Sequence, residues 1–434
     1  DPAEGEFLEN IHQEAIDNIK RLRNHACIAF GAVTMSAMML VQLGMAKAIY
    51  PAESGVRATD MEAFTDQYYV TLPEVVQEYS PFARYDGGSD DRNGDRHYWN
   101  VWHSKEPINS YNKARSRFFS EYGFQSFPEF ESVKRYAPYP EDWDIYSEDD
   151  VSPTRWRACQ GLIETYLLNE YRQPKDFEAF LYMNHVLQGD AIKTAIEATD
   201  GHALLHGNTF LAAQRLLARG FVGQPRRYCW PVASWASRDY YGRWKAQHYF
   251  ARQAYRDLLV SPIADEEGML NIYVVSDRPA SCSGTLDVKV IKLTGEIISD
   301  FRQTVKIAAN TSRKLFSIEL DKAKKYPKED VFIYARLTDK NKNIYSNQYF
   351  LVKQKEVNYP KVSITRDIKP VEGGFEVTLK SDYFARAVFL STVMQKALSA
   401  TITLHTAGHS RIGCYLYRFI AVDVGKATES NITQ

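Results

Sequence analysis

Cysteine is scarce in this chain, and neither sign of charge is in excess. The five cysteines are irregularly spaced, so they form neither a metal-ligand pattern nor a recognisable disulfide framework. Lysine and arginine total 53 against 54 aspartate and glutamate residues, which gives a formal net charge of −1. A chain so balanced has no electrostatic reason to bind nucleic acid or an anionic membrane surface. We therefore expect neither partner, and the sequence implies no metal ion and no organic cofactor.

An initiator methionine and a signal peptide are also absent, since the chain begins at Asp1. These absences are compatible with a fragment of a longer protein. The one long apolar run covers residues 27–50 and has the length to cross a membrane. It does not have the apolar stripe and polar opposite face of a surface helix.

The first 260 residues carry the pattern of an α/β fold. Apolar residues in 7–25 recur at steps of three and four, which predicts a helix, and Cys27–Phe30 reads as a short buried strand. A second helix is predicted from Pro174, at a first helical position, to about Ala198. A third is predicted from Tyr241 to Leu259. Such alternation of strands and helices is typical of α/β proteins.

After residue 262 the pattern changes to strands. Apolar residues alternate from Leu286 to Val290 and from Phe375 to Leu379, and Phe332–Leu337 reads as another strand. Turn residues separate these runs, as in β-sandwich proteins. We expect three parts: an α/β domain at 1–261, an immunoglobulin-like β-sandwich at 262–355, and a second, incomplete sandwich module at 356–434.

One acidic residue, Glu121, lies in an unusual setting. The stretch RFFSEYGFQSFPEF, residues 117–130, surrounds it with aromatic residues, glycine and proline. A lone glutamate is ordinarily a surface-turn residue, and hydrolytic carboxylates work in pairs. Two other aromatic-rich stretches are HYWNVWHSKEP at 97–107 and CWPVASWASRDYYGRWKAQHYFAR at 229–252. Flat aromatic faces suit sugars, but they serve cores and interfaces as well.

Together the three stretches resemble the β-mannosidases of glycoside hydrolase family 2, over about residues 5–392 with breaks. The resemblance implies the C-terminal portion of a (β/α)8 TIM barrel, with catalytic groups at the C-terminal ends of its strands, followed by immunoglobulin-like modules. It implies exo-hydrolysis of terminal β-D-mannosyl residues with retention, so the expected partner is a mannose-containing oligosaccharide. A periplasmic or secreted location is compatible with the full-length protein, and no metal site is implied.

The resemblance also suggests roles for particular residues. SEYGFQSFP is the family's nucleophile motif, so Glu121 is expected to attack the anomeric carbon, and it must stay ionised to do so. The candidates for lining the sugar site are Trp99, Trp102, His103 and Trp230. For Trp99 and Trp102, simple packing of the loop remains an alternative. Arg238, Asp239 and Arg243 are expected to form structural ion pairs.

The acid/base partner of Glu121 is missing from its expected place. The family carries it in a motif like LWCGNNE after RLRNHPCIA; this chain has RLRNHACIA at 21–29, followed by FGAVTMSAMML. Residues 30–39 can be encoded so that a two-base shift reads Trp-Cys-Gly-Asn-Asn-Glu. The glutamate codon then straddles Met35 and Ser36, where the acid/base is expected.

Similar shifts restore family-like motifs at 149–156, 202–213 and 394–404. Because codon choice is free, a single match would be weak, but four at the expected places favour a frame error. The apolar run is then a by-product of the shifted reading rather than a membrane helix. We expect four segments to be translated out of frame: about 30–57, 149–160, 200–227 and 393–434.

The sequence leaves the activity open between three alternatives. The first is a retaining exo-β-mannosidase whose catalysis is impaired by the missing acid/base. The second is a non-catalytic carbohydrate-binding or scaffold relative that keeps aromatic residues and has lost the proton donor. The third is another family 2 glycosidase, such as a β-galactosidase.

Overall fold

A computed structural model describes most of the chain and divides it into two compact units. Unit 1 comprises Asp1–His97 and Ser116–Glu121, and unit 2 comprises Tyr98–Arg115 and Tyr122–Gln434. The residues outside the description are 1–4, 26–29, 33–65, 82–83, 87–94, 115–117, 144–156, 203–231, 321–325, 372–373, 390, 393–399, 407–431 and 434.

Unit 1 contains two packed helices, α1 (Gly5–Leu22) and α5 (Leu72–Tyr79). The predicted helix at 7–25 is therefore confirmed. A π-helical turn, Asp66–Thr71, precedes α5. The guanidinium of Arg23 donates to the carbonyl of Tyr79 at 2.7 Å, which ties the ends of the two helices together.

The strands of unit 1 pair in parallel, as βα units require. β1 (Phe30–Ala32) pairs with β2 (Arg84–Asp86), and β3 (Asp95–His97) pairs with β4 (Phe118–Glu121). The predicted strand at Cys27–Phe30 lies mostly outside the described residues, and β1 begins at its last residue. β3 and β4 carry the first stretch of the candidate site.

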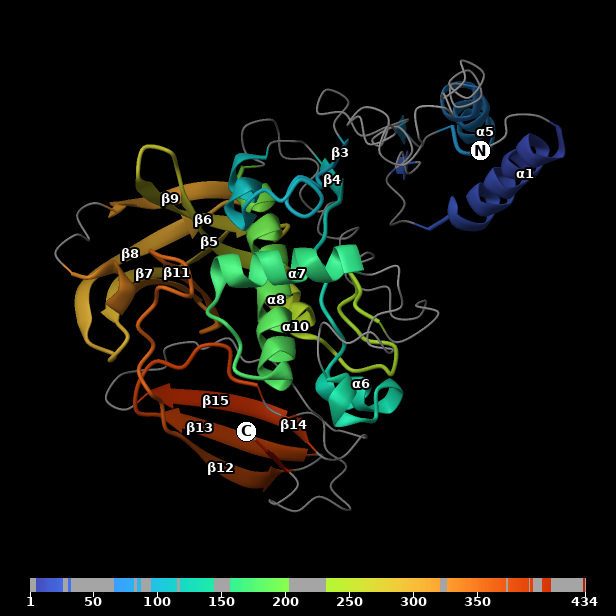
Figure 1. The fold of residues 1–434 in the computed structure, drawn as a ribbon. Coiled ribbons are helices and arrows are strands. Elements are labelled where there is room, and N and C mark those ends of the chain that lie inside the picture. Colours follow the sequence, from blue (N-terminus) through green and yellow to red (C-terminus); the bar gives the residue numbers. More distant parts are fainter. Residues whose placement is uncertain are drawn as a thin grey trace. The chain divides into compact units, whose positions relative to one another are not determined.

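Unit 2 begins with a helical layer around one long helix, α8 (Phe177–His202). Figure 1 shows α8 in the middle of this unit, crossed by α7 (Arg157–Glu170) and lying beside α10 (Ala246–Ala254). A Cβ atom on Gly189 would lie 2.5 Å from the Phe250 ring, so only glycine allows this close approach of α10 to α8. Three short helices complete the layer: Ile108–Lys113, α6 (Phe130–Tyr136) and Pro140–Asp142.

Two of the predicted helices have other bounds in the structure. α8 begins at Phe177 rather than Pro174, because the Asp176 carboxylate accepts the Ala179 N–H and caps the helix. The predicted helix Tyr241–Leu259 is shorter at both ends. Its first residues form a turn in which Arg238 and Trp244 pair, and strand β5 already begins at Leu258.

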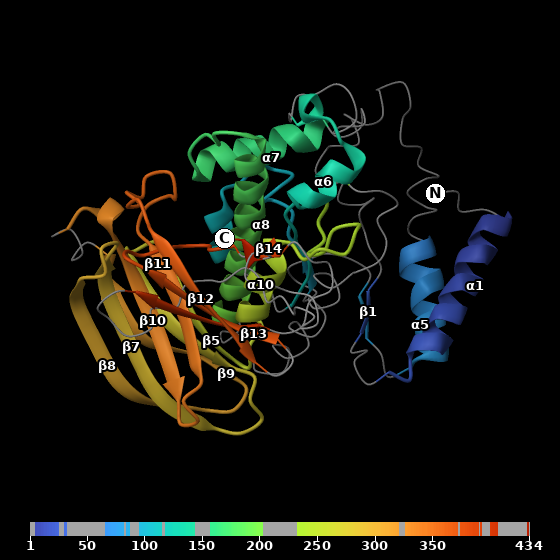
Figure 2. The same cartoon turned by 90° about the horizontal axis from the view of Figure 1, so that it is seen from below.

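An immunoglobulin-like β-sandwich follows the helices. One sheet has the strand order β5-β6-β9 and the other β11-β10-β7-β8, with antiparallel pairs throughout. Figures 1 and 2 show the two layers face to face. The strands are β5 (Leu258–Ala264), β6 (Met269–Ser276), β7 (Cys282–Lys292), β8 (Ile297–Ile307), β9 (Thr311–Glu319), β10 (Val331–Asp339) and β11 (Ile344–Phe350).

The core of the sandwich explains its sequence pattern. Leu286, Val288 and Val290 on β7 are at most 6% exposed and lie in one cluster with Ile272 of β6 and Ile333 of β10. Side chains alternate across a strand, so a period of two places every second residue in this core. The predicted strands at 286–290 and 332–337 are thereby confirmed.

A further three-stranded sheet lies C-terminal to the sandwich in the sequence. It has the order β12-β13-β15, in which β13 and β15 run parallel, while β14 pairs with β16. Val377 and Leu379 on β13 are buried, as their alternation predicted. The strands are β12 (Ile364–Val371), β13 (Gly374–Ser381), β14 (Ser391–Thr392), β15 (Ala400–Thr406) and β16 (Ile432–Thr433). The boundaries predicted at 261 and 355 stay predictions.

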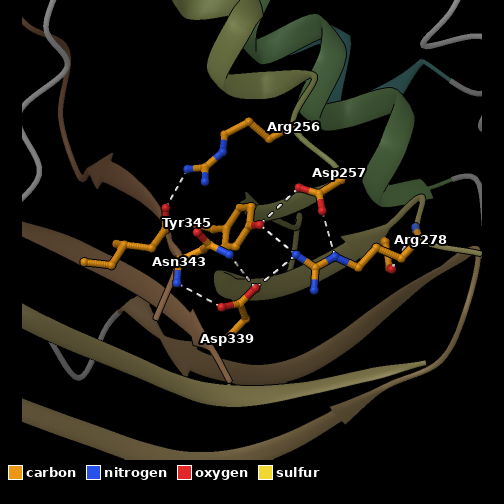
Figure 3. Close-up of polar contacts among 8 residues, drawn as sticks. Arg256, Asp257, Arg278, Asp339, Asn343 and Tyr345 are labelled. Carbon is orange, nitrogen blue, oxygen red and sulfur yellow. Dashed lines mark hydrogen bonds and ion pairs between the residues drawn. The ribbon is translucent and has the colours of Figure 1, made fainter. Parts of the chain in front are cut away.

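An arginine-centred network joins the helical layer to the sandwich (Figure 3). Arg278, which follows β6, donates to Asp257 at 2.7 Å, to Asp339 at 3.0 Å and to the Tyr345 hydroxyl at 2.8 Å. Tyr345 in turn donates to Asp257, just after α10. Arg256 stacks on the Tyr345 ring at 3.9 Å. These contacts connect the end of α10 with the hairpin between β10 and β11.

The same network shifts the acidity of its carboxyl groups. Burial alone would raise the pKa of Asp339, but hydrogen bonds from Asn343 and Arg278 outweigh it and hold this pKa below its usual value. Asp257 behaves in the same way. Burial would raise its pKa, but hydrogen bonds from Arg278 and Tyr345 outweigh burial and lower it. Native-state carboxylates with lowered pKa values stabilise the fold above their unfolded pKa, and that stability is lost on acidification.

Replacing Arg278 by methionine tests this network. The variant Arg278→Met should lower the free energy of unfolding at pH 6 by about 2 kcal/mol, since Asp339 stays buried without its cation while half-exposed Asp257 is screened by water. The difference between variant and parent should shrink as the pH falls from 6 to 3, because the unfolded chain then begins to take up protons at these carboxylates while the folded parent resists doing so. Urea unfolding at both pH values measures it.

Lys292→Met is the matched control, because its ion pair with Glu296 is exposed. It should leave stability nearly unchanged at either pH. An Arg278→Met protein as stable as the parent at pH 6 would contradict this account of the network.

Among the residues that the structure describes, no helix combines the length and the apolar character needed to cross a membrane. The apolar run 27–50 lies almost wholly outside that set, with only residues 30–32 described. The four segments expected out of frame likewise lie mostly outside it.

Candidate functional site

Glu121 is the last residue of β4 and pairs with His97, the last residue of β3. The strands are parallel, so their carboxyl ends meet at one edge, which brings the two side chains together. His97 Nδ1 lies 3.5 Å from Glu121 Oε2, and the two side chains are 5% and 12% exposed. Phe119, on the same strand as Glu121, is buried.

In unit 2, Trp99 and Trp102 form a cluster with Trp235. The Trp235 ring lies 5.0 Å from Trp99 and 5.3 Å from Trp102, in both cases edge to face. Trp102 is fully buried and stacks parallel to the Tyr166 ring at 5.7 Å, whereas Trp99 is half-buried. Phe124 packs edge-on against Trp102 at 4.7 Å. Trp102 is thus a packing residue, and Trp99 and Trp235 form the partly exposed side of the cluster.

His103 lies at the solvent side of the same cluster. Its side chain is exposed, and its ring lies 5.3 Å from Trp99 and 6.1 Å from Trp235. The backbone N–H of His103 donates to the carbonyl of Trp99 at 2.9 Å, which closes a tight turn. The structure therefore brings three predicted residues together with Trp235 in one place.

Glu106 closes the loop that carries these residues. Its carboxylate accepts hydrogen bonds from the Tyr98 hydroxyl and the Asn100 amide, both at 3.0 Å. Its backbone N–H donates to the carbonyl of Asn100, and its carbonyl accepts from the Tyr166 hydroxyl at 2.7 Å. One acidic side chain at the end of HYWNVWHSKEP therefore fixes both ends of the turn.

The backbone that follows Glu121 in the chain is held by side chains of α8. The Gln188 amide donates to the carbonyl of Phe124 at 2.8 Å, and its carbonyl accepts from the Ser126 hydroxyl at 2.6 Å. The Asn184 carbonyl accepts the Phe127 N–H at 2.9 Å. Asn184 and Gln188 are one helical turn apart, so both face the same segment.

His185 on the same helix donates from Nε2 to the carbonyl of Phe127 at 2.8 Å. Desolvation lowers the pKa of His185 to about 4, and the nearby Lys245 adds to the effect. The imidazole is therefore neutral at physiological pH, with its proton on Nε2. It serves as a backbone anchor rather than as an acid.

A buried lysine joins this segment to the one around Trp235. Ser126 and Ser234 exchange backbone hydrogen bonds at 3.1 and 2.9 Å, an isolated bridge outside any named strand. Lys245 Nζ donates to both of their carbonyls, at 3.0 and 2.9 Å, and the residue is fully buried. Desolvation lowers the pKa of Lys245 to about 7, although the carboxylate of Asp239 acts in the opposite direction.

The basic and acidic residues at 238–243 form local structural contacts. Arg238 Nε donates to the carbonyl of Gly242 at 2.8 Å and lies over the Trp244 ring. The Asp239 carboxylate accepts the Arg243 N–H at 2.8 Å and a hydrogen bond from the Ser132 hydroxyl. The ion pair that the structure gives for these residues joins Arg243 to Glu129 at 3.9 Å, and the contacts of Arg238 and Asp239 described here are hydrogen bonds and a cation–π contact.

Three expected positions lie outside the described residues: Trp230, and Met35 and Ser36 where the acid/base is expected. Within the described part of the chain, no group of three or more His, Cys, Asp or Glu side chains could hold a metal ion. The chemistry that the described residues support is that of a carboxylate beside an imidazole in unit 1 and of an aromatic cluster in unit 2.

Gly123 makes the cluster possible, because a Cβ atom there would lie 2.8 Å from Trp235 and 3.1 Å from Trp99. Gly123→Ala should lower the free energy of unfolding by about 1–3 kcal/mol, since the added methyl group would collide with both rings, and each ring is held against other aromatic side chains of the cluster. It should also reduce the near-ultraviolet circular dichroism of the tryptophans.

Gly161→Ala is the matched control for Gly123→Ala. A Cβ atom on Gly161, inside α7, meets nothing within 4 Å. The control should leave the tryptophan signal intact and raise stability slightly, because alanine favours helix. A Gly123→Ala protein with unchanged signal and stability would show that the cluster is loose.

In a search against protein families, residues 268–356 match the Mannosidase Ig/CBM-like domain. These residues cover the sandwich from the end of the β5–β6 turn to just beyond β11. The family match therefore concerns the immunoglobulin-like part of the chain.

Among curated proteins, the chain is 29% identical over 264 residues to "Beta-mannosidase B" of Aspergillus terreus, covering 57% of this chain and 30% of that protein. It is 25% identical over 369 residues to the protein of the same name in Aspergillus clavatus, covering 75% and 40%. The chain thus spans less than half the length of these relatives.

Among solved structures, the crystal structure of β-D-mannosidase from Dictyoglomus thermophilum matches with a TM-score of 0.71 and 23% identity. The match covers 91% of this chain and 47% of that one. The exo-chitosanase of Amycolatopsis orientalis matches with a TM-score of 0.52 and 12% identity, covering 84% and 44%. At these identities the likeness concerns the fold.

Proposed function

We propose that this chain, which is similar to β-mannosidases, is part of a retaining exo-β-mannosidase of glycoside hydrolase family 2. The proposed substrates are oligosaccharides or glycoconjugates that end in a β-D-mannosyl residue. The relatives named β-mannosidase support this proposal. We propose further that residues 1–261 are the C-terminal portion of a (β/α)8 barrel, which the parallel pairs β1–β2 and β3–β4 favour.

Glu121 is the proposed nucleophile. Its position at the carboxyl end of a parallel strand is where barrel enzymes carry catalytic groups. In the proposed reaction the Glu121 carboxylate attacks the anomeric carbon, the bond to the leaving oxygen breaks, and a covalent glycosyl-enzyme forms. Water then attacks the same carbon and releases mannose with retained configuration, which returns Glu121 to its carboxylate form.

The single observation that carries this proposal is the contact of Glu121 with His97. A nucleophile must be ionised, although burial opposes charge. The imidazole 3.5 Å away offers a donor or a positive charge to a carboxylate that is only 12% exposed. Two such polar groups at the same strand edge are difficult to explain by packing alone.

In this chain the proposed enzyme lacks its second carboxylate, the acid/base. Protonation of the leaving oxygen and deprotonation of the attacking water are therefore both impaired. General acid–base help contributes roughly 10²–10⁴ in rate. Loss of the acid slows departure of a poor leaving group, whereas an activated aryl group leaves without a proton. Loss of the base slows attack by water on the glycosyl-enzyme.

Kinetics with added azide test whether Glu121 still forms the glycosyl-enzyme while the missing acid/base limits its hydrolysis. With an activated aryl β-mannoside, the chain should release the aryl group, and azide should accelerate turnover and yield mannosyl azide, because azide attacks without a general base. Glu121→Gln should lower the aryl release by at least about 10³-fold, since no covalent intermediate can form.

Glu129→Gln is the control, because Glu129 is a buried carboxylate on the same stretch that is paired with Arg243 at 3.9 Å. It should retain most of the aryl release. Full activity of Glu121→Gln would contradict the proposal, and binding of mannosides without any turnover would favour the non-catalytic alternative.

We propose that the missing acid/base results from a shifted reading frame at about 30–57. Sequencing the gene across these codons should reveal bases that encode Asn-Asn-Glu in another frame, with the glutamate codon across Met35 and Ser36. A well-covered gene without those codons would instead favour evolved loss of the donor.

A further inference from the structure

The segment after Glu121 and the segment before Trp235 meet through side chains instead of a continuous sheet. Only one backbone bridge, between Ser126 and Ser234, joins them in the described part of the chain. Buried carbonyl groups need donors, and where no ladder supplies them another group must. Here the donors come from α8 and from the residue that precedes α10.

Gln188 and Lys245 supply these donors. Gln188 donates to the carbonyls of Phe124 and Ser234, at 2.8 and 3.3 Å. Lys245 donates to the carbonyls of Ser126 and Ser234, at 3.0 and 2.9 Å. Both residues are completely buried, so water cannot replace either side chain.

The bonded carbonyls flank the residues of the aromatic cluster. Trp235 follows Ser234 directly, and the rings of Trp235 and Trp99 lie against the backbone of Gly123, next to Phe124. The Phe124 ring itself packs on Trp102 at 4.7 Å. A shift of either backbone segment would therefore separate the rings.

We infer that Gln188 and Lys245 are positioning residues of the proposed glycosidase: they fix the two backbone segments and, through them, the cluster of Trp99, Trp102 and Trp235. The functional part of this inference rests on the proposed function. Neither side chain is given a chemical step. Their role is to hold a partly exposed aromatic surface in one arrangement.

The buried amine also has a consequence for stability. The charged or titratable groups acting on it are Asp239 from its own loop and His185 from α8. With a folded pKa of about 7 and an unfolded value near 10.4, the unfolded chain binds more protons between these pH values. This group therefore makes the fold more stable as the pH rises from about 7 to 10.

Gln188→Leu and Lys245→Met test the inference in the full chain. Each keeps the side-chain volume and removes the donors. The readout is the near-ultraviolet circular dichroism difference between each protein and its Trp235→Phe derivative, which isolates the cluster from the other tryptophans. We expect this difference to fall at least twofold in both variants, and the rise in stability between pH 7 and 10 to diminish in Lys245→Met.

Lys193→Met is the control, because it breaks a largely buried pair with Glu197, further along the same helix than Gln188. It should reduce stability while the tryptophan difference spectrum stays intact. If Lys245→Met does not fold, Gln188→Leu decides the matter alone.

An unchanged difference spectrum in a folded Gln188→Leu or Lys245→Met protein would overturn the inference. This readout needs no turnover, so it is independent of the proposed activity. If the parent chain hydrolyses an activated aryl β-mannoside, Gln188→Leu should lower kcat/KM at least tenfold. Most of this loss should come from a higher KM rather than from a lower kcat. A variant with an unchanged tryptophan difference spectrum but no turnover would show that the substituted residue affects the catalytic step and not the aromatic cluster.

Discussion

Hydrogen bonds from buried side chains to backbone carbonyls hold the segment that follows Glu121. Asn184, Gln188 and Lys245 satisfy groups that a longer sheet would have paired. Buried backbone groups without partners are costly, so this arrangement is stable only when every donor is present. The aromatic cluster and the turn around Ser234 both depend on it.

Helix α8 connects this segment with the rest of unit 2. Toward the sandwich, the Asn347 amide donates to Glu197 at 2.6 Å and Lys193 donates to the same carboxylate. Burial raises the pKa of Glu197, although Lys193 and Asn347 act against it. Toward the C-terminal segment, Arg386 pairs with Asp190. One helix therefore links the cluster, the sandwich and the chain beyond it, which explains why it carries so many buried polar residues.

The elements with clear periodicity could be predicted from the sequence. The helix at 7–25 and the strands around Leu286 and Phe332 follow from their apolar spacing, because in each case one face is buried. The third predicted helix was too long at both ends, since a local turn in which Arg238 pairs with Trp244 replaces its start and strand β5 of the sandwich replaces its end. The apolar spacing of the segment marks neither of these limits.

The site was predictable only in part. Aromatic residues in HYWNVWH point to a cluster, and three of them do lie together. His97, at the start of the same stretch, was missed, because its meeting with Glu121 depends on parallel pairing of strands twenty residues apart. Gln188 and Lys245 were missed as well: a buried polar residue on an apolar helix is a signal, but its partners are backbone groups that the sequence does not mark.

The central claim is that Glu121 forms a covalent bond with the sugar. A 2-fluoro-mannosyl fluoride tests it most directly, since its fluoride leaves without a proton and the fluorinated intermediate hydrolyses slowly. After labelling, proteolysis and mass spectrometry, the account predicts one added fluoromannosyl group, on the peptide that contains Glu121. A label on any other residue of a folded chain would contradict the account.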